Sequence, residues 1–380
     1  MRKQIITQNA SGTWAASTQV NTAIERVGVI TRLYMVNEVT PSATLGAASQ
    51  PDGLFRPVGN LRIVGSPHTY LTLPAPVDAG QAGTLLHYIA KHQGLGLGHP
   101  DGVITAPSLT YTAVSYPFHC GVRPKDKYGR DNPFDLSAFV PASAESQLNV
   151  EWVTTANSVM DDTVTITSAV MRFTLCRILG SVAEIQAEMA AQELTLPPGV
   201  PAMRPAFSAN GHVNVGATTD FSTETIDVPV GGFISQISIL TQDAVATRPA
   251  RANDELTRLQ IWSVKTSEPL YEARLDYLNM GLEYGSNLEA DDAAADFQAH
   301  CPKGIFLLDC RGMATAVADV GGRIMTFPHM RDYGWDFRGL NGGDIRLGLF
   351  NNLYAAGDDS LFLFHRYQEY RDRIIVNPAS

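Results

Sequence analysis

Histidine clusters are the first place to look for metal chemistry in this chain. Four of its nine histidines fall in one stretch, at His87, His92, His99 and His119. Metal-dependent enzymes built on paired β-sandwiches hold their ion with a His-x-His pair and a following glutamate, and no His-x-His occurs in the sequence. A spacing of five also places His87 and His92 on different faces of a helix. The pattern therefore predicts surface or hydrogen-bonded histidines without a metal ion.

Two adjacent carboxylate pairs, Asp161-Asp162 and Asp358-Asp359, are the next candidates. Such pairs usually mark solvated turns, because aspartate bonds its own backbone at a loop tip. Calcium binding and acid–base catalysis are the alternatives, since glycoside hydrolases on β-sandwiches use paired carboxylates. These hydrolases also need a cleft lined by aromatic side chains. The tryptophans are instead scattered along the chain, at Trp14, Trp152, Trp262 and Trp335.

Cysteines and glycines carry no recognisable motif. The cysteines are Cys120, Cys176, Cys301 and Cys310, and no two of them form a C-x-x-C pair. We expect buried, reduced thiols, because a catalytic cysteine needs a base close by. No glycine cluster follows a strand and opens a helix, so no phosphate cradle is indicated. The sequence thus predicts no catalytic residue, no cofactor and no metal site.

One local basic cluster spans residues 123–130, in the order Arg-Pro-Lys-Asp-Lys-Tyr-Gly-Arg. A solvated loop is the favoured interpretation. The functional alternative is a contact with an acidic neighbouring subunit. Residues 196–380 would suit that contact, since they contain 15 basic and 23 acidic residues, a net charge of −8.

Length and composition restrict the class of protein. A chain of 380 residues suits two domains of about 150–200 residues each. Its 17% charged residues fall below the usual ~25%, which fits a surface partly covered by neighbouring molecules. The net charge of −10 argues against direct nucleic-acid binding. Because no signal peptide follows Met1 and no stretch approaches the ~20 apolar residues of a membrane span, we expect a soluble protein made in cytoplasm.

Period-two alternation of apolar and polar residues dominates both halves and predicts antiparallel strands with one wet face. Residues 148–152 alternate strictly, with Leu148, Val150 and Trp152 on one face. Further strands are expected at 29–36, 109–118, 164–175, 236–239, 259–264, 305–308, 345–349 and 361–367. Short helices are predicted at 84–93 and, from capping boxes, after Ser181 (to about Glu193) and after Ser286. The sequence is therefore that of an all-β protein with a few short helices.

The two halves of the chain resemble each other. When residues 148–173 are shifted by 197, the apolar positions and the Asp-Asp-hydroxyl loop fall on residues 345–370. Two copies of an eight-stranded sandwich fit the length and the strand spacing. The expected limits are an N-terminal arm (1–26), a first sandwich with a trailing helix (27–195), a Pro-rich linker (196–205), a second sandwich (206–370) and a C-terminal arm (371–380).

The order of these segments resembles the major capsid proteins of tectivirus-like phages, which are tailless and icosahedral and carry an internal membrane. Four stretches carry the resemblance: residues 85–94 with their Lys-x-Gln-Gly ending, residues 109–152, the Pro-Lys-Gly segment at 302–304 before a strand, and the final hairpin at 345–370. Members of that family often begin with a longer amphipathic helix near the membrane. Here residues 1–20 are polar, which departs from the family pattern.

The resemblance implies a double jelly roll and a structural, non-enzymatic role in the virion. It implies homotrimers of pseudo-hexagonal outline that tile the facets of an icosahedral shell. The implied partners are further copies of the chain, other capsid proteins at vertices or in minor positions, and an internal membrane beneath the shell. Two alternatives stay open: a two-domain β-sandwich carbohydrate-binding protein or hydrolase, and a minor or vertex protein of the same fold.

Overall fold

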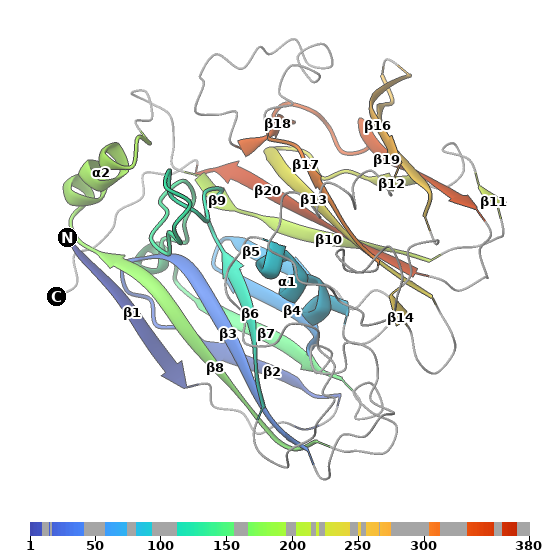
Figure 1. The fold of residues 1–380 in the computed structure, drawn as a ribbon. Helices are drawn as coiled ribbons and strands as arrows, with labels where there is room; N and C mark the ends of the chain where they lie inside the picture. The colour runs from blue at the N-terminus through green and yellow to red at the C-terminus, as the bar shows by residue number, and fades with distance from the viewer. Residues whose placement is uncertain are drawn as a thin grey trace. The chain divides into compact units, whose positions relative to one another are not determined.

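The computed structural model describes the following residues: 1–9, 15, 17–41, 58–73, 81–92, 112–155, 166–194, 203–213, 218–219, 225–243, 250–251, 256–265, 267–274, 304–311, 333–352 and 359–370. The chain divides into two compact units. The first unit comprises Met1–Pro74, Ala79–Ala206 and Gln368–Ser380, and the second comprises Ala75–Asp78 and Phe207–Tyr367. Strands make up most of the ordered structure of both (Figure 1).

The first unit contains two antiparallel sheets. One has the order β1 (Arg2–Asn9), β8 (Ile166–Leu179), β3 (Val29–Pro41) and β6 (Thr112–His119). The other has the order β5 (Thr69–Leu73), β4 (Val58–Gly65), β7 (Leu148–Thr154) and β2 (Gln19–Ala23). A three-residue strand, β9 (Met203–Pro205), also belongs to this unit. Strands β1 and β2 both fall within the stretch expected as an arm; the arm, linker and sandwich limits stay a prediction.

The second unit repeats this arrangement. One set of paired strands has the order β10 (Phe207–Val213), β20 (Asp359–Glu369), β13 (Phe233–Asp243) and β17 (Ile305–Asp309). The other has the order β16 (Glu268–Arg274), β15 (Arg258–Ser263), β19 (Ile345–Asn352) and β12 (Thr225–Asp227). Short strands add to these: β11 (Thr218–Thr219) and β14 (Ala250–Arg251), and β18 (Trp335–Asp336), which pairs with β13.

The eight main strands of the two units are therefore topologically equivalent. β1, β8, β3 and β6 of the first correspond to β10, β20, β13 and β17 of the second, and β5, β4, β7 and β2 correspond to β16, β15, β19 and β12. The internal repeat seen in the sequence is a repeat of structure. β7 and β19 start 197 residues apart, which is the offset that aligned the two halves.

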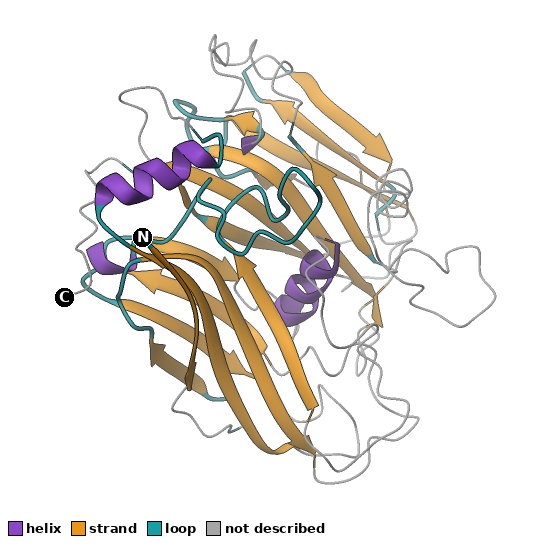
Figure 2. Ribbon diagram, turned by 60° about the vertical axis from the view of Figure 1, so that its left-hand side comes forward, coloured by secondary structure: helices purple, strands orange, loops and turns teal. Residues whose placement is uncertain are grey.

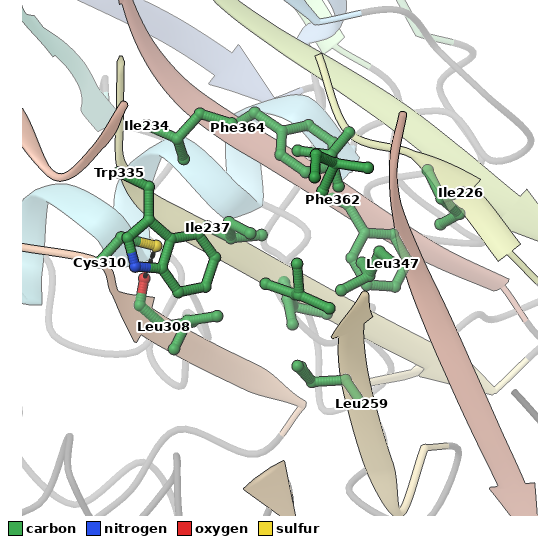
Figure 3. Packing of buried hydrophobic residues seen from close by; sticks show 14 of the residues in the cluster. Ile226, Ile234, Ile237, Leu259, Leu308, Cys310, Trp335, Leu347, Phe362 and Phe364 are labelled. Atoms are coloured by element: carbon green, nitrogen blue, oxygen red, sulfur yellow. Dashed lines mark hydrogen bonds between the residues drawn. The ribbon is translucent and has the colours of Figure 1, made fainter. Parts of the chain in front are cut away.

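Alternation of buried residues explains how the sheets form. In β7 every second side chain is buried, from Leu148 to Thr154, and β15 alternates in the same way. In the second unit, apolar residues of β13, β15, β17, β19 and β20 pack in one cluster that also contains Trp335 and Phe337. Figure 3 shows part of this cluster, with Trp335 beside Cys310 at one end. Each strand thus contributes one apolar face to a core between two sheets.

One expectation about strand faces is wrong. Gln236 and Ser238 of β13 were expected on a wet face, but both are buried. Their burial is tolerated because their polar atoms have partners: Gln236 Nε2 donates to Ser238 Oγ at 2.8 Å, and that hydroxyl lies 3.0 Å from His365 Nε2 on β20. Both faces of β13 therefore lie away from solvent at these positions.

Helices are few and short in the part of the chain that the structure describes (Figure 2). α1 (Gln81–His92) buries Ala82, Leu85, Leu86 and Ile89, one helical stripe, and packs against β4 and β6. α2 (Val182–Ala191) starts at the predicted capping box, in which Ser181 and Glu184 exchange both bonds. A 3₁₀ turn, η1, covers Ala142–Ala144. The helix expected after Ser286 lies outside the described residues.

Candidate interaction site

The candidate site lies next to a β-bulge that occurs at equivalent positions in both units. Thr31 bulges out of β3, and Ser235 bulges out of β13 at the equivalent position. The bulged carbonyl oxygen accepts from the amide of the cysteine that follows the neighbouring strand: Cys120 N donates to Thr31 O at 3.0 Å, and Cys310 N donates to Ser235 O at 2.8 Å. The frame around the bulge is thus the same in the two units.

The side chain after the bulge differs between the units, and in the first unit it is Arg32. Its side chain is 0% exposed. Arg32 Nη1 donates to both carboxylate oxygens of Asp131, at 2.9 and 3.0 Å, and to Tyr34 Oη at 2.6 Å. Nη2 donates to the carbonyl oxygen of Asn132 at 3.3 Å. A buried guanidinium is costly unless its donors are used, so this arginine fixes the loop that it contacts.

The two ends of that loop, which spans residues 121–139, are buried next to the sheet. Asp135 Oδ2 accepts from Arg123 N at 2.8 Å and from Ser137 Oγ at 2.7 Å, and Ser137 Oγ accepts in turn from Val122 N at 2.8 Å. A Cβ added to Gly121 would lie 1.9 Å from Asp135 Oδ2, so only glycine fits there. The carboxylate therefore ties together the two ends of the loop.

Next to the buried ends of the loop, His119 is the last residue of β6 and is itself buried. Its Nδ1 donates to the carbonyl oxygen of Gly121, with the two atoms 2.8 Å apart. Burial and the nearby Arg32 guanidinium lower the pKa of His119, so the ring is neutral. His119 is thus a hydrogen-bonded histidine, one of the two kinds that the sequence predicted, and it bonds to the loop.

The tip of the loop is a tight turn around Asp126. Asp126 Oδ1 accepts from Tyr128 N at 2.8 Å and from Arg130 N at 2.9 Å, and Gly129 has a φ of +75°. Three side chains project from this turn: Lys127 is 65% exposed, Tyr128 70% and Arg130 72%. The Tyr128 ring has the Arg130 guanidinium 4.9 Å and the Lys127 ammonium 5.6 Å from its centroid.

The end of α2 holds the loop from a third side. Gln192 Oε1 accepts from Leu136 N at 3.1 Å, while Gln192 Nε2 donates to the carbonyl oxygen of Phe134 at 3.0 Å. Lys127 Nζ lies 3.5 Å from the exposed carboxylate of Glu193. The basic cluster expected from the sequence is thus the exposed tip of a loop whose two ends are held in place by hydrogen bonds. Sequence patterns gave no sign of Arg32, Asp135 or Gln192, whose roles depend on burial.

The sequence patterns also gave no sign of a second buried carboxylate, that of Glu145. Glu145 is 1% exposed; it lies 2.7 Å from His68 Nδ1 and accepts from the Tyr70 hydroxyl. Tyr370 packs edge-on against His68 and donates to the carbonyl oxygen of Phe139 at 3.0 Å. Burial and the neighbouring Tyr370 and Glu145 raise the pKa of Tyr70. This cluster lies within the first unit and fixes the residue that follows β20.

The remaining sequence candidates that lie in the described part of the chain are not brought together into a second site. His87 and His92 lie on α1, whereas His99, Cys301, Trp14, Asp161 and Asp162 lie outside the described residues. Asp359 is not on a solvated turn as expected: it is buried at the first position of β20. Trp152 and Trp335 are core residues rather than cleft residues. Among the described residues, no three His, Cys, Asp or Glu side chains gather as metal ligands.

The described thiols are buried and free, as predicted. Burial raises the pKa of Cys176 to about 11 and raises the pKa of Cys120 and of Cys310 further still. A thiol with so high a pKa is not a nucleophile near neutral pH. No described helix is long and apolar enough to cross a membrane.

Comparison with known proteins was informative only at the level of structure. No family model and no curated protein matches the sequence. The major capsid protein of Sulfolobus turreted icosahedral virus aligns with a TM-score of 0.62 and 14% identity, over 96% of this chain and 97% of that chain. PBCV-1 VP54 aligns with a TM-score of 0.54 and 9% identity, over 97% of this chain and 93% of that chain.

These alignments run through both units and nearly the whole of each partner, so they compare the complete architecture. At such low identity they establish the fold. Together with the repeated strand order, they confirm the expected fold class. The chain is a double jelly roll, all-β with a few short helices, and its fold is that of the capsid proteins of icosahedral viruses.

Proposed function

We propose that this protein is the major capsid protein of an icosahedral virus and that it acts as a shell subunit in the virion. The observation that carries the proposal is the pair of equivalent jelly rolls, which the capsid protein of Sulfolobus turreted icosahedral virus matches along 97% of its length. The fold supports an assembly role because the two units of the chain repeat one frame.

The repeat suggests how the chain assembles. Three chains around one axis bring together six nearly equivalent sandwiches, which gives a homotrimer a pseudo-hexagonal outline. Blocks of that outline tile a flat facet, with other capsid proteins needed where facets meet at vertices. The low charged fraction of 17% fits a molecule whose sides are covered by neighbouring copies. An internal membrane beneath the shell stays part of the proposal.

The protein has no catalytic step in this proposal. A β-sandwich hydrolase or carbohydrate-binding protein would need aromatic side chains open to a sugar. Trp152 and Trp335 are instead packed in the two cores. The described thiols are poor nucleophiles, and the buried carboxylates Asp135 and Glu145 bond to neighbouring protein groups. These two carboxylates therefore serve structure.

Light scattering behind a sizing column tests the proposal. We expect a species of about 123 kDa, three times the 41.1 kDa chain, that assembles further when salt or pH is changed. A stable 41.1 kDa monomer at high concentration would overturn it, and a screen against immobilised glycans would then test the carbohydrate-binding alternative. A pentamer would identify a vertex protein of the same fold.

A further inference from the structure

We infer that the exposed tip of the 121–139 loop, formed by Lys127, Tyr128 and Arg130, is a contact by which one copy of the chain binds an acidic surface of a second copy. The inference rests on the proposed shell function and specifies a surface used in assembly. Three features of the tip carry it: a fixed base, an exposed aromatic–cation group, and a charge opposite to that of the rest of the chain.

The first feature is rigidity. Arg32 is buried under the loop, Asp135 joins the loop ends, and Gln192 bonds to Phe134 and Leu136. At the tip, Asp126 accepts from two backbone amides, so the turn holds its own shape. Binding by such a loop loses little conformational entropy, since the contacting residues are ordered before the partner arrives.

The second feature is the chemistry of the tip. Tyrosine and arginine are the residue types most often found at the energetic centres of protein interfaces. Here a tyrosine ring is 70% exposed, more than any other large hydrophobic side chain of the described residues, and Arg130 is stacked over it. Beyond its contacts with Arg130 and Lys127 the ring faces solvent, and a partner would cover it.

The third feature is charge. Residues 123–131 contain four basic and two acidic side chains. Asp126 is bonded to Arg130 and Asp131 to Arg32, and the Asp131 side chain stays 46% exposed. With four basic and two acidic side chains the segment has a net charge of +2, whereas the chain as a whole has a net charge of −10. A second copy of the chain is therefore an attractive partner for the loop.

Charge also favours a protein partner over nucleic acid. A nucleic acid that approached this single small patch would meet the repulsion of a body with net charge −10. An acidic protein surface, in contrast, offers spaced carboxylates to Lys127 and Arg130 and an apolar area to Tyr128. We therefore assign the partner as a second copy of this chain.

The test measures association of copies by sedimentation velocity over a range of concentrations. The variants are Tyr128→Ala and Lys127→Gln, which leave the Asp126 turn and the Arg130 pair in place. We expect Tyr128→Ala to raise the dissociation constant about ten-fold or more, as for an interface centre. We expect Lys127→Gln to weaken association by a smaller factor and to reduce its dependence on salt.

Matched controls lie side by side in the second unit. Val264→Ala removes an exposed apolar side chain, and Lys265→Gln removes a 51% exposed lysine whose Nζ lies 2.9 Å from Asp344. Both controls should associate like the wild type. Circular dichroism and Tm values equal to those of the wild type would show that each variant is folded.

The outcomes separate the inference from the proposed function. If the wild type associates and the tip variants associate equally well, the tip is not a contact, and the shell function stands. If the wild type stays monomeric, both are wrong. If a labelled DNA duplex binds the wild type and Tyr128→Ala abolishes that binding, the partner is nucleic acid and our assignment is overturned.

Discussion

The two jelly rolls share a frame and differ at the residue that follows the bulge of β3 and β13. Arg32 of the first unit pairs in register with Cys176 and His119, and Gln236 of the second pairs with His365 and Asp309. Arg32 bonds outward to a loop, whereas Gln236 bonds to Ser238 on its own strand. One equivalent position thus fixes a surface loop in the first unit and completes a buried network in the second.

Substitution at this position is the strongest test of the comparison. Arg32→Met removes a buried cation that bonds to the loop, and we expect a loss of about 3 kcal/mol in the free energy of unfolding. Gln236→Met removes a neutral pair, and we expect about 1 kcal/mol. Urea unfolding of both variants measures the difference. Equal losses would contradict the view that only the first unit uses this position to hold a loop.

Glycines of positive φ offer a second comparison across the units. A Cβ on Gly28 (φ +67°) would lie 2.4 Å from the carbonyl oxygen of Ile178, and one on Gly334 (φ +85°) would lie 2.0 Å from that of Ile234. We expect each change to alanine to cost about 2 kcal/mol or more, because strain adds to a clash.

Gly343 (φ +83°) is the control, since a Cβ there meets nothing within 4 Å. Gly343→Ala should cost only about 1 kcal/mol, the penalty of the backbone conformation itself. Thermal unfolding of the three variants tests this order. A Gly343→Ala variant as unstable as Gly28→Ala would show that close approach to the neighbouring strand is not what selects glycine.

A smaller effect concerns pH. The pKa of His119 is lowered by burial and by Arg32. The unfolded chain takes up a proton near pH 6.5 and the folded chain does not, so stability falls as the pH drops through that value. His119→Asn keeps a donor toward Gly121 and removes the titration. From about pH 7.5 to about 5.5, the Tm of the wild type should therefore fall further than that of the variant. Parallel curves would show that His119 takes up its proton in the folded state.

The smallest effect should be the reactivity of the equivalent cysteines. Cys120 and Cys310 directly follow the equivalent strands β6 and β17 and are both buried with raised pKa values. After iodoacetamide treatment at pH 8, peptides that contain either residue should be unlabelled in the native protein and fully labelled in urea. Native labelling of one of them by peptide mapping would show that the two sites are not equivalent.

The sequence predicted the parts of the fold that depend on local pattern. Alternation marked β7, the capping box marked the start of α2, and the 197-residue shift matched β7 to β19. β1 was not expected, because a partly exposed edge strand with Ile5 turned to solvent carries little hydrophobic pattern. The burial of Gln236 and Ser238 was also missed, since burial of polar groups depends on partners far away in the chain.

The candidate site was predictable only in part. Residues 123–130 were recognisable as a basic cluster because charge is visible in the sequence. The buried residues that hold the cluster in place were not recognisable. Asp135 lies only a few residues after the tip, but Arg32 lies about 90 or more residues before it, and only folding brings the two together. The exposure of Tyr128 likewise follows from the turn around Asp126 and not from its neighbours in the chain.

The proposed shell function depends most on whether three chains, each with two equivalent jelly rolls, form a pseudo-hexagonal block. Averaged electron-microscope projections of the purified protein test this directly. We expect particles with a three-fold axis and six lobes of similar size, alternating between first and second units. Isolated two-lobed particles at every concentration, or rings with a different number of lobes, would contradict it.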